Sequence, residues 1–142
     1  MLRLSKKTEY ALIALREIAL NSGKQVTTAR EISEFHQIPR DLLAKILQIL
    51  ARNGLIQSLQ GAHGGYVLNK PIDEITLFRL LEILEGPVGL VDCLIPEKET
   101  CVRKEICPVR HELNQVNHQV LEVLQGVTLR HFLFSELSVA AS

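Results

Sequence analysis

Residues 28–69, TAREISEFHQIPRDLLAKILQILARNGLIQSLQGAHGGYVLN, decide the fold of this 142-residue chain. The stretch opens with Thr28 and, three residues later, Glu31, and this spacing is the capping box that starts a helix. Pro39 suits the first turn of a second helix, because its missing N–H would have no partner there in any case. Apolar residues then recur at helical spacing up to Asn53-Gly54, a signal for a helix C-terminus. The stretch therefore predicts two consecutive helices joined by a short turn.

A hairpin is predicted after these two helices. Residues 55–60 and 66–69 are short β-prone runs on either side of the glycine-rich stretch 61–65, a pattern typical of two antiparallel strands and their turn. Before the two helices, apolar residues recur every three or four positions from Thr8 to Leu20, as on an amphipathic helix. The order helix, helix, helix, hairpin predicts a mainly α fold with a small β-hairpin wing, the winged helix-turn-helix.

The remaining residues predict more helices around a loop. Residues 76–84 and 108–124 have the periodicity of amphipathic helices, and 128–134 are expected to form one last short helix. Residues 88–107 hold all three cysteines and show little periodicity, so we expect a loop there.

The charge divides the chain into two parts. The formal net charge is zero, but residues 1–72 hold ten Lys/Arg against five Asp/Glu, and residues 73–142 hold six against eleven. This asymmetry indicates different partners for the two halves, with a polyanion facing the first. We therefore expect a winged helix-turn-helix DNA-binding domain over 1–72, and a second part over 73–142 that carries the cysteine loop and the long helix.

Several classes of protein are excluded at this point. No apolar run approaches the ~20 residues that span a bilayer, and Lys6, Lys7 and Glu9 stand where a signal peptide would need its apolar run. We therefore expect a cytoplasmic protein that does not bind membranes, in which reduced thiols are the default rather than a disulfide framework. No phosphate-binding loop, nucleophile elbow or paired-carboxylate signature indicates an enzyme.

The predicted DNA contacts lie at the start of the second helix of the pair, on the wing and at the N-terminus. In a helix-turn-helix the second helix enters the major groove by its first residues. Arg, Lys and Gln donate to purine edges or phosphates, and wing glycines let the backbone approach a phosphate or the minor groove. The residues expected to contact double-stranded promoter DNA are Arg3, Lys6, Lys7, Thr28, Arg40, Asp41, Lys45, Gln48, Gln60, Gly61, His63, Gly64 and Tyr66.

The cysteines Cys93, Cys101 and Cys107 fall within fifteen residues, in the pattern C-x7-C-x5-C. Three thiols in a polar loop cannot all be core residues, and thiolates that converge suit a soft metal centre or a redox role. Structural zinc sites favour four ligands with tighter cysteine pairs. An iron–sulfur cluster tolerates longer spacings. We therefore predict an iron–sulfur cluster, 2Fe-2S or 4Fe-4S, whose fourth position is open or takes a weaker ligand.

From residue 2 to about residue 133, the chain resembles the IscR/NsrR-type family of iron–sulfur winged-helix regulators. The resemblance rests on the opening LRLSKKTEYALIAL, on the "NGL" step and the "G-x-x-GGY" wing, and on ITLFRLLEILEG followed by the three-cysteine loop. It implies a homodimer in which the long helix after the cysteines is the dimerisation helix. It also implies a transcription regulator, more often a repressor, that senses redox state, nitric oxide or iron–sulfur status.

The same resemblance implies candidates for the fourth ligand. Nitric-oxide-sensing relatives use a carboxylate near the start of the first helix of the partner subunit, and the matching residue is Glu9. A two-iron relative also uses a histidine before the recognition helix, which His36 resembles. Another relative uses a histidine three residues after the last cysteine. That position is Arg110 here, which cannot bind iron, and His111 is one residue further on. Glu9 is therefore the expected ligand, with His36 and His111 as alternatives.

Two other functions and one departure from the family follow from the residues. A cluster-free regulator would instead form a reversible disulfide between Cys101 and Cys107. An electron-transfer or cluster-carrier protein would not need the helix-turn-helix, the wing or the basic half.

The wing arginine common in relatives is Gln60 here, and Ala44 stands where a relative has a base-selecting glutamate. The operator sequence is thus expected to differ.

Overall fold

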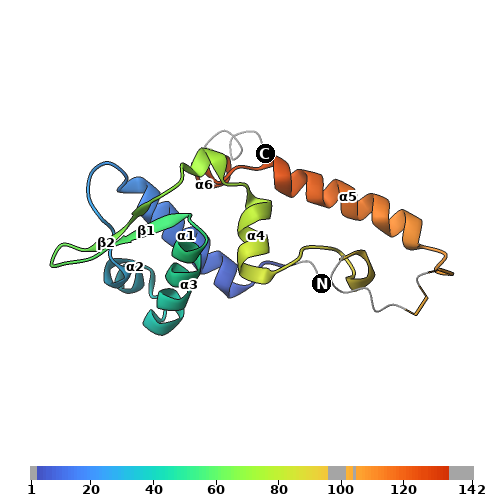
Figure 1. Ribbon diagram of the computed structural model, residues 1–142, viewed down its shortest axis with the longest axis horizontal. Helices are drawn as coiled ribbons and strands as arrows, with labels where there is room; N and C mark the ends of the chain where they lie inside the picture. Colours follow the sequence, from blue (N-terminus) through green and yellow to red (C-terminus); the bar gives the residue numbers. More distant parts are fainter. Residues whose placement is uncertain (1–2, 96–101, 104, 135–142) are drawn as a thin grey trace.

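The computed structural model describes residues 3–95, 102–103 and 105–134. A mainly helical body carries one hairpin, and a long helix extends away from it (Figure 1). The elements in chain order are α1 (Lys6–Leu20), α2 (Ala29–His36), α3 (Arg40–Arg52), β1 (Ile56–Leu59), β2 (Gly65–Leu68), the 3₁₀ turn η1 (Ile72–Glu74), α4 (Leu77–Glu85), the 3₁₀ turn η2 (Asp92–Leu94), α5 (Arg110–Gly126) and α6 (Leu129–Phe134).

The helix-turn-helix pair forms as the sequence predicts. Both bonds of the capping box are present at the start of α2: the Glu31 N–H donates to Thr28 Oγ1 at 3.1 Å, and the Thr28 N–H donates to Glu31 Oε2 at 3.3 Å. Gln37 ends α2 in the left-handed conformation, with φ of 55°. The chain then turns inward, because Ile38 is buried and its carbonyl accepts from Ser33 Oγ at 2.7 Å. This turn sets α3 against α2.

The predicted wing is a two-stranded antiparallel hairpin. Its register pairs Ile56 with Leu68 at one end and Leu59 with Gly65 at the other. The segment before α2 also pairs with the wing, through the Tyr66 N–H and the Thr27 carbonyl at 2.8 Å. This third contact was not predicted. It anchors the turn end of β2 to the segment that precedes α2.

The core lies between α1, α2, α3 and α4, with β1 and α6 at its edges. These elements bury aliphatic side chains on one face each, which is the expected use of amphipathic helices. The largest of the fully buried hydrophobic side chains are Leu15, Ile18, Ile32, Leu43, Ile46, Leu47, Leu50, Ile56, Ile75, Leu80 and Leu129.

The second part of the chain forms an arm. The C-terminal end of α5 is held to the body by two backbone bonds of 2.8 Å, from the Leu77 N–H to the Val127 carbonyl and from the Leu129 N–H to the Ile75 carbonyl. From there α5 extends outward, and the segment that follows α4 leads away from the body on the same side as α5 (Figure 1). This segment contacts α5 where the Leu90 N–H donates to Oδ1 of Asn117, the one buried residue of α5.

The boundaries of the arm differ slightly from the prediction. α5 begins at Arg110 rather than at residue 108 and runs on to Gly126. The loop predicted over 88–107 contains the short 3₁₀ turn η2, which was not expected. In the part of the chain that the structure describes, no helix has both the length and the hydropathy needed to cross a membrane.

Candidate DNA interface and cysteine site

The start of α3 presents the polar face that the sequence predicts. Arg40, Asp41, Lys45 and Gln48 are all exposed, while Leu43, Ile46 and Leu47 face the core. No described side chain caps α3, so the N–H groups of its first turn are available to an outside acceptor. The N-terminus of a helix is a ready site for a phosphate, because its free N–H groups and its dipole both favour an anion. This end of α3 can therefore meet DNA with side chains and backbone together.

The turn of the wing is exposed. Gln60, Gly61 and His63 are exposed, although the Gln60 amide donates to Ser58 Oγ at 3.2 Å. Position 64 has no room for a side chain, because a Cβ on Gly64 would lie 2.4 Å from the Leu59 carbonyl oxygen.

Two of the residues predicted to contact DNA, Tyr66 and Thr28, already have partners within the protein. Tyr66 is half-buried against the core and is paired through its backbone with Thr27, and Thr28 Oγ1 is occupied by its capping bond. Their expected DNA contacts stay predictions.

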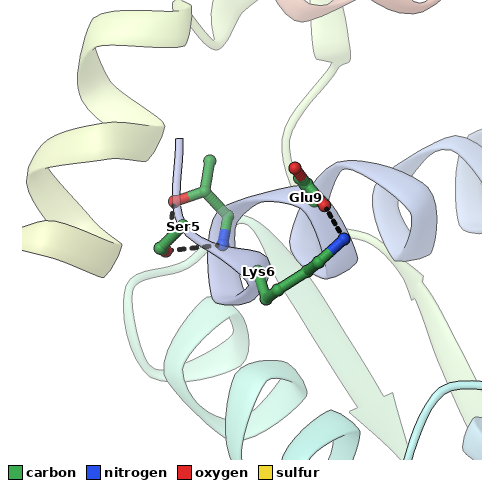
Figure 2. Close-up of polar contacts among 4 residues, drawn as sticks. Ser5, Lys6 and Glu9 are labelled. Atoms are coloured by element: carbon green, nitrogen blue, oxygen red, sulfur yellow. Dashed lines mark hydrogen bonds and ion pairs between the residues drawn. The ribbon is translucent and has the colours of Figure 1, made fainter. Parts of the chain in front are cut away.

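At the N-terminus, a predicted DNA contact and the predicted ligand are paired with each other. Lys6 Nζ donates to Glu9 Oε2 at 2.9 Å across the first turn of α1 (Figure 2), and the hydrogen bond raises the pKa of Lys6. Both side chains are exposed, so the pair is weak and easily exchanged for stronger partners. Arg3 is exposed, and Lys7 is half-buried.

The structure describes two of the three cysteines. Cys93 lies in η2 and Cys107 lies three residues before α5, and both are half-buried free thiols. Cys101 lies outside the described residues. Cys107 lines an open pocket of about 390 Å³ together with Leu94, Arg110, His111 and Asn114.

The surroundings of Cys107 fit an anionic group. Arg110 Nε is buried and has no hydrogen-bond partner among the described residues. No described side chain caps α5, and Arg110 is its first residue. An unpaired guanidinium N–H and a free helix N-terminus both favour negative charge beside Cys107. A thiolate, or an anionic iron–sulfur cluster held by thiolates, satisfies both. The described residues thus fit such a cluster. From the sequence, Arg110 is recognisable only as a residue that cannot bind iron.

The candidate fourth ligands lie apart from one another in the single chain. His36 Nε2 lies 3.0 Å from Glu17 Oε1, and both side chains are about one quarter exposed. His111 is exposed, lies 3.2 Å from the Gln115 amide nitrogen and shares the pocket of Cys107. Among the described residues, no three His, Cys, Asp or Glu side chains converge as metal ligands would.

One polar cluster was not predicted by the sequence analysis. Glu85, the last residue of α4, accepts hydrogen bonds from Ser5 Oγ and Thr8 Oγ1. These bonds, and the charge of Lys7, hold the pKa of the Glu85 carboxyl below its ordinary value of 4.5. Glu85 lies 80 positions from Ser5 and 77 positions from Thr8 in the chain, so no local sequence pattern could have revealed these hydrogen bonds.

The chain matches known proteins over almost its whole length. The Rrf2 family, described as an iron-dependent transcriptional regulator, matches residues 4–134. The chain is 32% identical to a helix-turn-helix regulator of Aquifex aeolicus, covering 91% of this chain and 90% of that protein. It is 30% identical to the regulator NsrR of Oceanobacillus iheyensis, with 99% and 95% covered, and 31% identical to the regulator CymR of Bacillus subtilis, with 90% and 87% covered.

Solved structures share the fold. The structure of CymR, the global cysteine regulator of B. subtilis, superposes with a TM-score of 0.77 at 30% identity, over 94% of this chain and 97% of CymR. The T. potens IscR structure has a TM-score of 0.70 at 22% identity, over 99% and 89%, which supports the fold alone. These relatives are transcription regulators and not enzymes.

Proposed function

We propose that the cysteines of this chain, which belongs to the Rrf2 family of DNA-binding transcription regulators, hold an iron–sulfur cluster. The state of this cluster would set the affinity of the protein for promoter DNA. The observation that carries the proposal is that Arg110 lines the pocket of Cys107 at the uncapped start of α5, while its buried Nε has no hydrogen-bond partner among the described residues. A buried donor without an acceptor is costly, and an anionic centre at Cys107 would remove that cost.

Cys93, Cys101 and Cys107 would hold the cluster, which supplies a redox-active, nitric-oxide-reactive iron centre when bound. Glu9 of the partner subunit would complete the site. Glu9 is paired with Lys6 in the single chain, so a Glu9 carboxylate that binds iron releases the Lys6 ammonium. Lys6 is then free to contact a phosphate. Coordination and DNA affinity are in this way linked through one exposed ion pair.

The proposed assembly is a homodimer formed through α5. Val109, just before α5, and Val116 and Val123 on α5 are 51%, 49% and 66% exposed, and at helical spacing of 100° per residue they lie on one face. A helix with such a face is stable when a partner covers it, and a second α5 is the expected partner. A two-fold dimer presents two α3 helices to two half-sites about one turn of DNA apart.

The proposed DNA contacts follow from this docking. The exposed start of α3 would read base edges with Arg40, Lys45 and Gln48, and its free N–H groups would bind a phosphate. The tip of the wing, with Gly61 and His63, would approach the minor groove. Because its partner is promoter DNA, we place the protein in the cytoplasm.

A second candidate function is a cluster-free thiol regulator. The similarity to CymR supports it. In this reading Cys101 and Cys107 lose two electrons and two protons to a peroxide and form a disulfide, and the peroxide is reduced. An electron-transfer or carrier function is not proposed, because the family consists of transcription regulators.

The deciding experiment is purification without oxygen, with assays of iron and acid-labile sulfide per monomer. A coloured protein whose absorption is lost in Cys101→Ala would support the cluster. Holo and apo protein are then compared for affinity to a duplex selected from a random library. A colourless, iron-free protein, even after anaerobic reconstitution, favours the thiol regulator and leaves DNA binding intact. A holo protein that binds DNA with the same affinity as the apo protein contradicts cluster sensing.

A further inference from the structure

Glu85 holds the first turn of α1 from the end of α4. Its Oε1 accepts from Ser5 Oγ and from Thr8 Oγ1, the latter at 2.7 Å. Ser5 is also the N-cap of α1, where its Oγ accepts the Thr8 N–H at 3.3 Å (Figure 2), and Thr8 is fully buried. One carboxylate thus engages both hydroxyls that define the start of α1.

The residues around Glu85 keep its carboxylate charged. Two hydroxyl donors and the Lys7 ammonium stabilise the anion, and no described neighbour opposes it with a second carboxylate, since Glu9 is paired with Lys6 and Glu82 with Arg79. The carboxylate also lies at the N-terminus of α1, where the helix dipole favours negative charge. The contact is therefore a charged one, and it is stronger than a neutral hydrogen bond.

On its other side, Glu85 leads directly into the segment that carries Cys93. Gly86 ends α4 with φ of 86°, and Cys93 follows six residues after Pro87. This segment, 86–95, is seated on α5 by the bond from the Leu90 N–H to Asn117 Oδ1 at 2.8 Å. It is also packed closely at Gly89, where a Cβ would lie 2.7 Å from the buried side chain of Ile95. A packed segment transmits a shift at one end to the other end.

We propose that Glu85 is a positioning residue that fixes the first turn of α1, with Lys6, Lys7 and Glu9, relative to the cysteine loop. Through this contact the state of the cysteine loop alters the affinity of the protein for DNA. The inference rests on the proposed function, because it names the contact by which the cysteine site acts on the DNA-binding half. Glu85 acts through Ser5 and Thr8 and touches neither DNA nor the cysteines itself.

Four variants of the whole 142-residue chain isolate this contact. Glu85→Ala removes the acceptor, and Glu82→Ala is its matched control, because Glu82 lies on the same helix but pairs with Arg79 rather than with α1. Thr8→Val removes one donor at constant size, and Thr8→Ser keeps the hydroxyl and should retain the contact. Two quantities are measured: amide hydrogen exchange at residues 8–10 in the apo protein, and the ratio of holo to apo affinity for the selected duplex.

We expect exchange at residues 8–10 to rise about fivefold or more in Glu85→Ala and in Thr8→Val, which is the scale of a lost helix cap. The ratio of holo to apo affinity should fall toward one in the same two variants, by about fivefold or more. Glu82→Ala and Thr8→Ser should match the wild type in both measurements. A merely structural contact would change exchange and leave the ratio as it is.

Three outcomes overturn the inference. Unchanged exchange in Glu85→Ala would show that the contact does not hold α1. Increased exchange with a wild-type affinity ratio would show a structural role only, while cluster sensing stands. A ratio of holo to apo affinity equal to one in the wild-type protein would overturn both cluster sensing and this inference. The wild-type ratio thus tests the proposed function, and the ratio in the Glu85→Ala variant tests the role of Glu85.

Discussion

Arg110 carries a buried Nε–H that no described group accepts, three residues after Cys107. Burying such a donor is tolerated where an acceptor completes the site. Arg110 also lines the pocket of Cys107, so it would place a positive charge beside the proposed cluster. In the proposed cluster site, Arg110 would stabilise the cluster rather than bind it, since a cation beside an anionic cluster favours the more reduced state.

Arg110→Met should therefore lower the reduction potential of the cluster. A lost charge-assisted hydrogen bond of about 1.5–3 kcal/mol corresponds to about 65–130 mV for a one-electron couple. The measurement is a redox titration of the anaerobic protein followed by its visible absorption. Arg79→Met, which removes an exposed arginine that pairs with Glu82 on α4, is the control and should leave the potential unchanged. Equal potentials in Arg110→Met and the wild type would contradict this role.

Glu85 makes the stability of the protein depend on pH in acid. Its pKa in the folded protein lies below the ordinary value of 4.5, chiefly because Ser5 and then Thr8 donate to it. A carboxyl with a lowered folded pKa stabilises the fold fully above its unfolded pKa, and this contribution is lost as the pH falls through the folded pKa. The contribution of Glu85 should thus be complete above about pH 5 and decline below pH 4.5.

Glu85→Gln should remove this part of the acid dependence. Thermal unfolding of both proteins between pH 3 and pH 7 measures it. The midpoint of the wild type should exceed that of the variant at pH 7, and the two should converge as the pH falls below 4.5. Curves that stay parallel over the whole range would argue against the carboxylate as the stabilising group.

At the scale of the elements, the wing depends on close backbone approach. Gly64→Ala would place a Cβ 2.4 Å from the Leu59 carbonyl oxygen and 3.0 Å from the Gly61 carbonyl oxygen, so the hairpin must shift. We expect a loss of about 1–3 kcal/mol in the free energy of unfolding. Affinity for the selected duplex should fall as well, because the wing tip moves.

Thermal unfolding and DNA titration check this expectation, and Gly126→Ala is the matched control. Gly126 ends α5, and a Cβ there meets nothing within 4 Å. Alanine is a better helix residue than glycine by about 0.5–1 kcal/mol, so the control should be as stable as the wild type or slightly more stable. A Gly64→Ala protein that unfolds at the same temperature as the wild type would show that the turn has room for a side chain.

The elements with local signals were predictable from the sequence. The capping box at Thr28, the stop at Asn53-Gly54 and the glycine turn each act within a few residues, so α2, α3 and the hairpin form where the pattern places them. The Tyr66–Thr27 pairing and the Glu85 contact join residues far apart in the chain, and no local pattern encodes them. Arg110 was passed over because a ligand search excludes arginine, although a positive charge close to Cys107 is informative.

At the scale of the whole molecule, α5 has two apolar faces. One face, near Asn117 and Leu124, packs against the segment after α4 and the body. The other, with Val116 and Val123, is 49% and 66% exposed. The arm also extends away from the body (Figure 1), so the body of the same chain does not cover this second face. A helix that is apolar on a solvent-exposed face marks an interaction site, and a second α5 has the matching shape and chemistry.

Val123→Asp should therefore weaken the proposed dimer. In a two-fold interface the substitution places two carboxylates near each other in an apolar contact, so the dimer dissociation constant should rise at least about tenfold. Sedimentation equilibrium of the apo protein measures it without any dependence on the cluster. Gln125→Asp introduces the same charge on the opposite side of α5, where it is exposed, and should leave the dimer intact.

The same variant connects assembly to function. If dimerisation through α5 sets the distance between the two α3 helices, Val123→Asp should also lose most of its affinity for a duplex with two half-sites. It should keep its weak affinity for a single half-site, because α3 and the wing of each chain are unchanged. A Val123→Asp protein that remains dimeric would place the interface elsewhere. A monomeric variant with full affinity for the double site would show that the spacing of the recognition helices does not depend on α5.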